Sequence, residues 1–101
     1  MIVYNISIKI NNAIGAEWVD WQKEEHIPDV MATGQFYDVK FYRLLEQHES
    51  DDLTYIVQYF ASSIDHYNTY IRDFAQSLRQ KAFDKWGSQF IAFRTIMQAV
   101  D

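Results

Sequence analysis

The sequence contains no cysteine, which excludes disulfides, thiolate nucleophiles and cysteine-ligated zinc or iron–sulfur centres. Its three glycines are scattered and build no phosphate-binding loop. No apolar run approaches the roughly 18 residues that a membrane-spanning helix needs. No basic run stands out in a chain of net charge −5, so the electrostatic attraction that drives nucleic-acid or anionic-membrane binding is missing. We therefore expect no metal, no cofactor, no nucleic acid and no membrane among the partners of this chain.

What the chain has in excess is apolar and aromatic side chains, at 49% and 17% of its residues. A chain of 101 residues forms one domain, here 1–101, and buries roughly two-thirds of its unfolded surface. Apolar residues beyond what such a core holds favour an oligomer. The N-terminal MIVYNISIKI has no basic leader and alternates apolar with polar residues, as a strand does. A cytoplasmic location is the expectation that follows.

Hydrophobic periodicity predicts six elements in the order β-α-β-β-α-β. Asn11 and Asn12 offer an N-cap for the first helix, and Ser62 with Asp65 resembles a capping box for the second, which Gly87 ends. A polar turn at 47–52 joins the second and third strands in a hairpin. The predicted strands are 2–10, 36–46, 53–61 and 89–98, and the predicted helices are 13–33 and 62–87.

This order predicts an α+β, ferredoxin-like sandwich with an antiparallel sheet of order 4-1-3-2 and both helices on one face. The other face stays open, and we expect a second copy to cover it and form a dimeric α/β barrel. We place Asn5, Gln58, Phe90, Ala92 and Arg94 on this open face as the dimer interface, with the strand register inferred. Once buried there, Arg94 needs either acceptors in the interface or a bound anion.

The stretch from Trp18 to Gly34 reads WVDWQKEEHIPDVMATG and contains the only proline, Pro28. Trp18, Trp21 and His26 lie along one stripe of a helix that Pro28 should stop or kink near His26, with Gly34 as the C-cap of a short second turn. At such a break, His26 is an acid or base near neutral pH, or else it caps helix-end carbonyls or pairs with the neighbouring glutamate. The two indoles either line a pocket or fill the core.

Other groups of residues are weaker candidates for a functional site. The polar turn places His48 among acidic residues, where it could attract a cation, although such turns usually stay solvated. An RNA-recognition module shares the β-α-β-β-α-β order and uses aromatics on its open sheet, for which Tyr55, Tyr59 and Phe90 qualify. The basic residues of that module are absent here. A phosphate cradle after the first strand, as in acylphosphatase-like proteins, is also missing.

With these residues in place, the sequence resembles a bacterial family, the domain of unknown function DUF4286. The resemblance covers nearly the whole chain, and its most specific part is the tryptophan pair with the HIPDV run. The family is similar to the dimeric α/β-barrel superfamily, which also holds small monooxygenases, isomerases and heme-associated or stress-induced proteins. This resemblance implies the fold and a dimer but no catalytic residue. The matching segments are Ile2–Asn5, Trp18 and Trp21, His26–Val30, Ala32–Gly34, Tyr55–Tyr59 and Phe90–Arg94.

In several enzymes of that superfamily the ligand cavity lies between sheet and helices, and in some branches a histidine near the end of the first helix lines it. His26 is the position that matches. Two hypotheses follow: a homodimeric small-ligand-binding or accessory module, or a cofactor-independent, monooxygenase- or isomerase-like enzyme that acts on a small aromatic substrate with His26 as acid or base. The pocket walls would be Trp18, Trp21, Tyr4 and Tyr59. A space beside His26 that the indoles fill completely would contradict the enzyme hypothesis.

Overall fold

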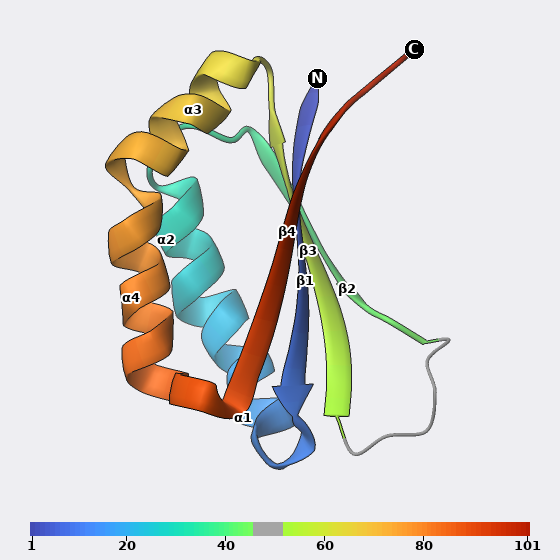
Figure 1. The fold of residues 1–101 in the computed structure, drawn as a ribbon, viewed down its shortest axis with the longest axis vertical. Coiled ribbons are helices and arrows are strands. Elements are labelled where there is room, and N and C mark those ends of the chain that lie inside the picture. Colours follow the sequence, from blue (N-terminus) through green and yellow to red (C-terminus); the bar gives the residue numbers. More distant parts are fainter. Residues whose placement is uncertain (46–51) are drawn as a thin grey trace.

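A computed structural model of the chain describes residues 1–45 and 52–101 and shows one antiparallel sheet with all helices on one of its faces (Figure 1). The sheet order is β2-β3-β1-β4, which is the predicted 4-1-3-2 order read from the other edge. The predicted α+β class and topology are therefore confirmed. The strands are β1 (Ile2–Asn11), β2 (Asp38–Arg43), β3 (Asp52–Ala61) and β4 (Phe90–Gln98).

The second strand is shorter than predicted, because β2 covers only six residues. Phe36, predicted as its first residue, precedes it and packs in the core against Tyr4 and Tyr59, with ring centroids 6.1 and 5.2 Å away. The polar turn, apart from Asp52 at the start of β3, lies outside the described residues. The candidate cation site at His48 lies there too.

The connection between β1 and β2 is helical almost throughout, and it contains a π-helical segment where an interruption was expected. Asn11 caps its start as predicted, since its Oδ1 accepts a hydrogen bond of 2.9 Å from the Ala13 N–H. The elements are η1 (Asn12–Ile14, 3₁₀), α1 (Gly15–Trp21), η2 (Gln22–His26, π) and α2 (Ile27–Met31), followed by Gly34 with φ of 78°.

Pro28 accounts for the π segment in physical terms. Its ring would clash with the carbonyl four residues earlier, and it has no N–H to bond that carbonyl. The chain widens the turn just before the proline, and the Ile27 N–H bonds the Gln22 carbonyl five residues back. The sequence predicts a stop or a kink near His26. The helical segment continues past this residue, so the stop is wrong, but the backbone irregularity lies at the predicted residues.

The connection between β3 and β4 contains two helices where the periodicity predicted one. Phe74, with φ of −127° and ψ of −35°, separates α3 (Ile64–Asp73) from α4 (Ala75–Trp86). The predicted capping box is also wrong, because the N-cap is Ser63 and its side chain makes no capping hydrogen bond. The predicted end at Gly87 is confirmed, with φ of 58° and ψ of −129°. A 3₁₀ turn, η3 (Gly87–Gln89), then leads into β4.

The strand register decides which side chains face the helices. Directly paired residues of an antiparallel sheet point to the same face. Phe90, Ala92 and Arg94 pair with Ile10, Ile8 and Ile6 of β1, whose alternate side chains pack under the helices. Their predicted place on the open face is therefore wrong by one residue. The sequence FIAFRTIM is apolar at odd and even positions alike, so its pattern cannot set the register.

The predicted open-face positions on β1 and β3 are correct. Asn5 pairs with Gln58, and the Gln58 side-chain amide donates a hydrogen bond of 3.2 Å to Asn5 Oδ1. On β4 the residues that share this face alternate with Arg94, and two of them, Ile91 and Phe93, are 57% and 63% exposed. The open face therefore carries a polar pair at its centre and apolar side chains along β4.

The turn at Gly87 is a testable determinant of where β4 begins. Only glycine adopts its combination of positive φ and extended negative ψ without strain. We expect Gly87→Ala to lower the free energy of unfolding by about 1–3 kcal/mol, measured by urea denaturation. The exposed neighbour Ser88 offers the control, and Ser88→Ala should stay within about 0.5 kcal/mol of the parent. Equal stability of the two variants would contradict the strain at Gly87.

Candidate functional site

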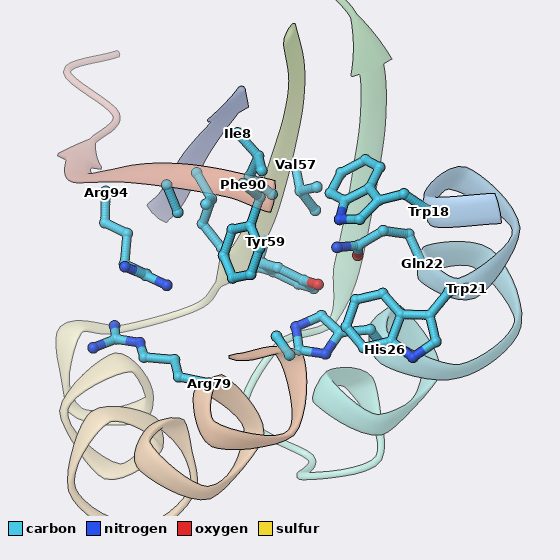
Figure 2. Close-up of a pocket in the computed structure, with 13 residues that line it drawn as sticks. Ile8, Trp18, Trp21, Gln22, His26, Val57, Tyr59, Arg79, Phe90 and Arg94 are labelled. Atoms are coloured by element: carbon cyan, nitrogen blue, oxygen red, sulfur yellow. The ribbon is translucent and has the colours of Figure 1, made fainter. Parts of the chain in front are cut away.

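A cavity lies between the helix-facing side of the sheet and the helices η2 and α4. Figure 2 shows its side chains converging from β1, β3, β4 and both helical connections. It is largely apolar, with a histidine, a glutamine and two arginines at defined positions. The lining residues are Ile6, Ile8, Trp18, Trp21, Gln22, His26, Val57, Tyr59, Arg79, Ala82, Phe90, Ala92 and Arg94.

The cavity is small. Its volume is about 50 Å³. Pockets for drug-sized ligands are typically about 300–1,000 Å³. This cavity is therefore suited to a few water molecules, or to a ligand of about one ring that reaches into the mouth.

Both tryptophans are core residues and cavity walls at once. Trp18 is 1% exposed and packs on Phe41 and Tyr55, with ring centroids 6.0 and 5.3 Å away. Trp21 is 8% exposed and meets the Trp86 ring edge-on at 5.8 Å. The indoles do not fill the space beside His26 completely, but the cavity that they leave, about 50 Å³, is much smaller than the few hundred Å³ expected for an enzyme pocket.

His26 is placed on the cavity by its contact with Trp21. Its ring stacks on the indole with centroids 4.7 Å apart and an interplanar angle of 24°. The helical segment continues through His26 into α2, so no helix-end carbonyls are there for the imidazole to cap, and the predicted alternative of a capping role is wrong. Burial lowers the pKa of His26 from 6.5 to about 4, assisted by the positive charges of Arg94 and Lys81 and opposed by Asp29. The imidazole is therefore neutral at neutral pH.

Besides His26, the cavity is lined by an amide side chain and two guanidinium groups. Gln22 is 3% exposed, and its Oε1 has no hydrogen-bond partner among the residues that the structure describes. Arg79, on α4, donates a hydrogen bond of 2.9 Å to the Tyr4 hydroxyl. Arg94 reaches the same region from β4, and Figure 2 shows the two guanidinium groups directed toward one another. Both arginines are solvent-accessible.

Of the two predicted tyrosine walls, the structure places only one in the cavity. Tyr59 lines it, and burial raises the pKa of its hydroxyl well above the ordinary range, so the phenol stays protonated. Tyr4 lies behind the wall in an aromatic cluster with Tyr59 and Tyr70. Its contribution to the site is indirect, because its hydroxyl accepts the Arg79 hydrogen bond.

Sequence reasoning missed Gln22 and Arg79, although a spacing signal existed for both. Gln22 lies four residues after Trp18 and four before His26, on the same stripe. Arg79 lies between the apolar positions Leu78 and Ala82 of the second helical pattern. A polar residue inside an apolar stripe indicates a buried polar contact or a site.

The family described as Domain of unknown function (DUF4286) matches residues 1–100. The chain belongs to this family. No curated protein matches this DUF4286 chain. Among solved structures, an ethyl tert-butyl ether d (EthD) family protein from Bacillus halodurans C-125 is similar at 15% identity and a TM-score of 0.68, with 99% of this chain and 100% of that chain covered.

A de novo designed protein, Foldit4, is similar at 7% identity and a TM-score of 0.53, with 97% of both chains covered. At these identities both likenesses concern the fold alone, and they agree with the ferredoxin-like arrangement of this DUF4286 protein. Among the described residues, no helix is both long and apolar enough to cross a membrane.

The burial of His26 predicts a pH dependence of stability in this DUF4286 protein. The unfolded state binds a proton at His26 below about pH 6.5, whereas the folded state does so only near pH 4. The free energy of unfolding should therefore fall as the pH drops from 6.5 to 4, by up to on the order of 3 kcal/mol from this residue. Urea denaturation across this range measures the effect.

His26→Gln should remove that part of the slope, whereas His66→Gln, on the exposed surface of α3, should retain it. Identical slopes in the parent and His26→Gln would show that the folded imidazole protonates as readily as the unfolded one. Titration of the His26 ring resonances by NMR provides a direct second measurement.

Proposed function

We propose that this DUF4286 protein is a small-ligand-binding module that acts as a homodimer. The observation that carries the proposal is the cavity between sheet and helices, where an apolar wall surrounds a few convergent polar groups. That combination is typical of small-molecule sites, because apolar walls supply affinity and the polar groups fix orientation. Gln22 adds to it, since its buried Oε1 has no hydrogen-bond partner among the described residues, which reduces stability. Rotation of the amide would present this acceptor to a bound ligand.

The state of His26 supports binding over the alternative, cofactor-independent catalysis. An efficient acid or base has a pKa near the working pH. With a pKa of about 4, the imidazole is not in its cationic form at neutral pH, so no imidazolium is there to act as a general acid. The neutral ring is also a weak base. A neutral imidazole stacked on Trp21 can still donate or accept one hydrogen bond, which suits recognition.

The open sheet face supports the homodimer. One layer of helices covers only one side of the sheet (Figure 1). The other side presents the exposed apolar residues Ile91, Phe93 and Met97 along β4, beside the Asn5–Gln58 hydrogen bond on the central strands. An exposed apolar surface of this kind typically marks an interface. A second copy fits because the face already satisfies its central polar groups and can meet its own image across a two-fold axis.

Filling the cavity tests the binding function. Ala82 lines the cavity from α4, and Ala82→Phe should block it with a side chain that adds no charge. We expect a neutral one-ring aromatic such as phenol to shift the backbone NMR resonances around Trp21 and His26 in the parent and not in Ala82→Phe. The control is Ser77→Phe, on the exposed side of the same helix. Identical shifts in Ala82→Phe and the parent would place the binding elsewhere.

Adjacent residues on opposite faces of β4 test the dimer. Phe93 lies on the open face and Arg94 on the helix-facing side. Phe93→Asp should convert a dimer to a monomer, because two carboxylates would be buried in an isologous interface, whereas Arg94→Gln should leave the dimer intact. Sedimentation equilibrium gives the masses. A parent protein that sediments as a monomer at 100 µM, or a Phe93→Asp variant that still dimerises, would contradict the proposed interface.

A further inference from the structure

We propose that the ligand of this cavity is a small aromatic carboxylate, one ring in size, that bears a hydroxyl or amino group on the side of the ring opposite the acid. The inference rests on the proposed binding function and names the ligand class of the same site. Three features of the cavity carry it: a cationic end, an unpartnered acceptor at the other end, and a small apolar space between them.

The cationic end is formed by Arg79 and Arg94. In Figure 2 their guanidinium groups converge from α4 and β4 at one end of the cavity. Among the described residues, no carboxylate forms a salt bridge with either arginine, although the chain has five more acidic than basic residues. The Tyr4 hydroxyl orients Arg79 and neutralises no charge. Two convergent guanidinium groups without a counterion match the oxygens of a planar carboxylate.

Gln22 forms the opposite end. Figure 2 places it beyond Tyr59 and Phe90 as seen from the arginines, between Trp18 and Trp21. Its Oε1 is buried without a hydrogen-bond partner among the described residues. Such an acceptor loses its hydration without compensation, a cost that a donor on the ligand removes once the amide group rotates to turn its oxygen toward the cavity. A hydroxyl or an amino group supplies that donor.

Between the two ends the cavity is bounded by apolar and aromatic side chains, including Ile8, Val57, Tyr59 and Phe90. The limited space excludes a bulky or branched body, and a flat ring is the largest group that it would hold, with part of the ligand in the mouth. A neutral His26 at the same wall adds no charge that would compete with the arginines for the acid. A flat ring with an anion at one end and a donor at the other therefore satisfies all three features together.

Three probes separate the features: phenol has the donor alone, benzoate has the acid alone, and 4-hydroxybenzoate has both. Dissociation constants come from NMR titration of the parent protein at pH 7. We expect 4-hydroxybenzoate to bind at least tenfold more tightly than either single-group probe. If phenol binds as tightly as 4-hydroxybenzoate, the binding function stands and the ligand class is overturned. If none of the three shifts a cavity resonance, the binding function itself fails.

Variants at the two ends of the cavity then test which residue binds the acid of the ligand and which binds its hydroxyl group. Arg94→Gln should weaken benzoate and 4-hydroxybenzoate by about tenfold and leave phenol unchanged. Gln22→Met, close in length and without hydrogen-bonding amide atoms, should weaken phenol and 4-hydroxybenzoate and leave benzoate unchanged. Arg72→Gln is the matched control, since that arginine is exposed and paired with Asp73. Equal losses for all three probes in Arg94→Gln or Gln22→Met would indicate a general structural effect and overturn the assignment.

The pKa of His26 provides a further test, because it would not change on ligand binding if Arg94 had only a structural role. The positive charge of Arg94 contributes to the low pKa of His26. A carboxylate bound to Arg94 offsets that charge, so benzoate and 4-hydroxybenzoate should raise the NMR-observed pKa of His26, whereas phenol should not. An unchanged pKa with saturating 4-hydroxybenzoate would place its acid away from Arg94.

Discussion

The candidate site depends on a backbone constraint that Pro28 imposes on the helix that carries the tryptophans. Because proline lacks an N–H and its ring crowds the preceding turn, the helix widens into a π segment at Gln22–His26. A wider turn has more residues than an α turn, so residues four apart return to nearly the same side. Trp18, Gln22 and His26 consequently all reach the cavity. A regular α-helix would rotate successive members of this series progressively away from the sheet.

The same segment shows how the protein combines a dense aromatic core with a polar cavity. Trp18, Trp21 and Tyr59 are almost fully buried and supply much of the apolar contact between sheet and helices. Gln22 is buried among them with an acceptor that no described residue satisfies, which costs folding free energy. Proteins tend to retain such a cost where a site needs it. The aromatic packing is what allows the fold to tolerate it.

The two faces of the sheet have different roles, and β4 serves both. On the helix-facing side it contributes Phe90, Ala92 and Arg94 to the cavity, and on the open side it presents Ile91 and Phe93. Residues that line the cavity therefore alternate along one strand with residues of the proposed interface. In the dimer we propose, contacts on the open face would restrain the strand that carries Arg94, so assembly and ligand binding would share a structural element.

The sequence by itself determined the element order, the sheet order, the family and the position of the helical irregularity. Alternation in β1, the cap at Asn11 and the glycine at 87 are local signals that tertiary packing did not override. It also identified Trp18, Trp21, His26 and Tyr59, which converge on one cavity. Local periodicity suffices for these because each lies on a strongly patterned element.

Only the tertiary structure decided which face of β4 meets the helices. That strand is apolar on both faces, so a one-residue shift in register has little effect on its pattern, and pairing with β1 had to select it. The same pairing placed Arg94 in the cavity, where Arg79 of α4 also lies, and not in the interface predicted from the sequence. A site built across elements is set by long-range packing, which no local pattern of residues encodes.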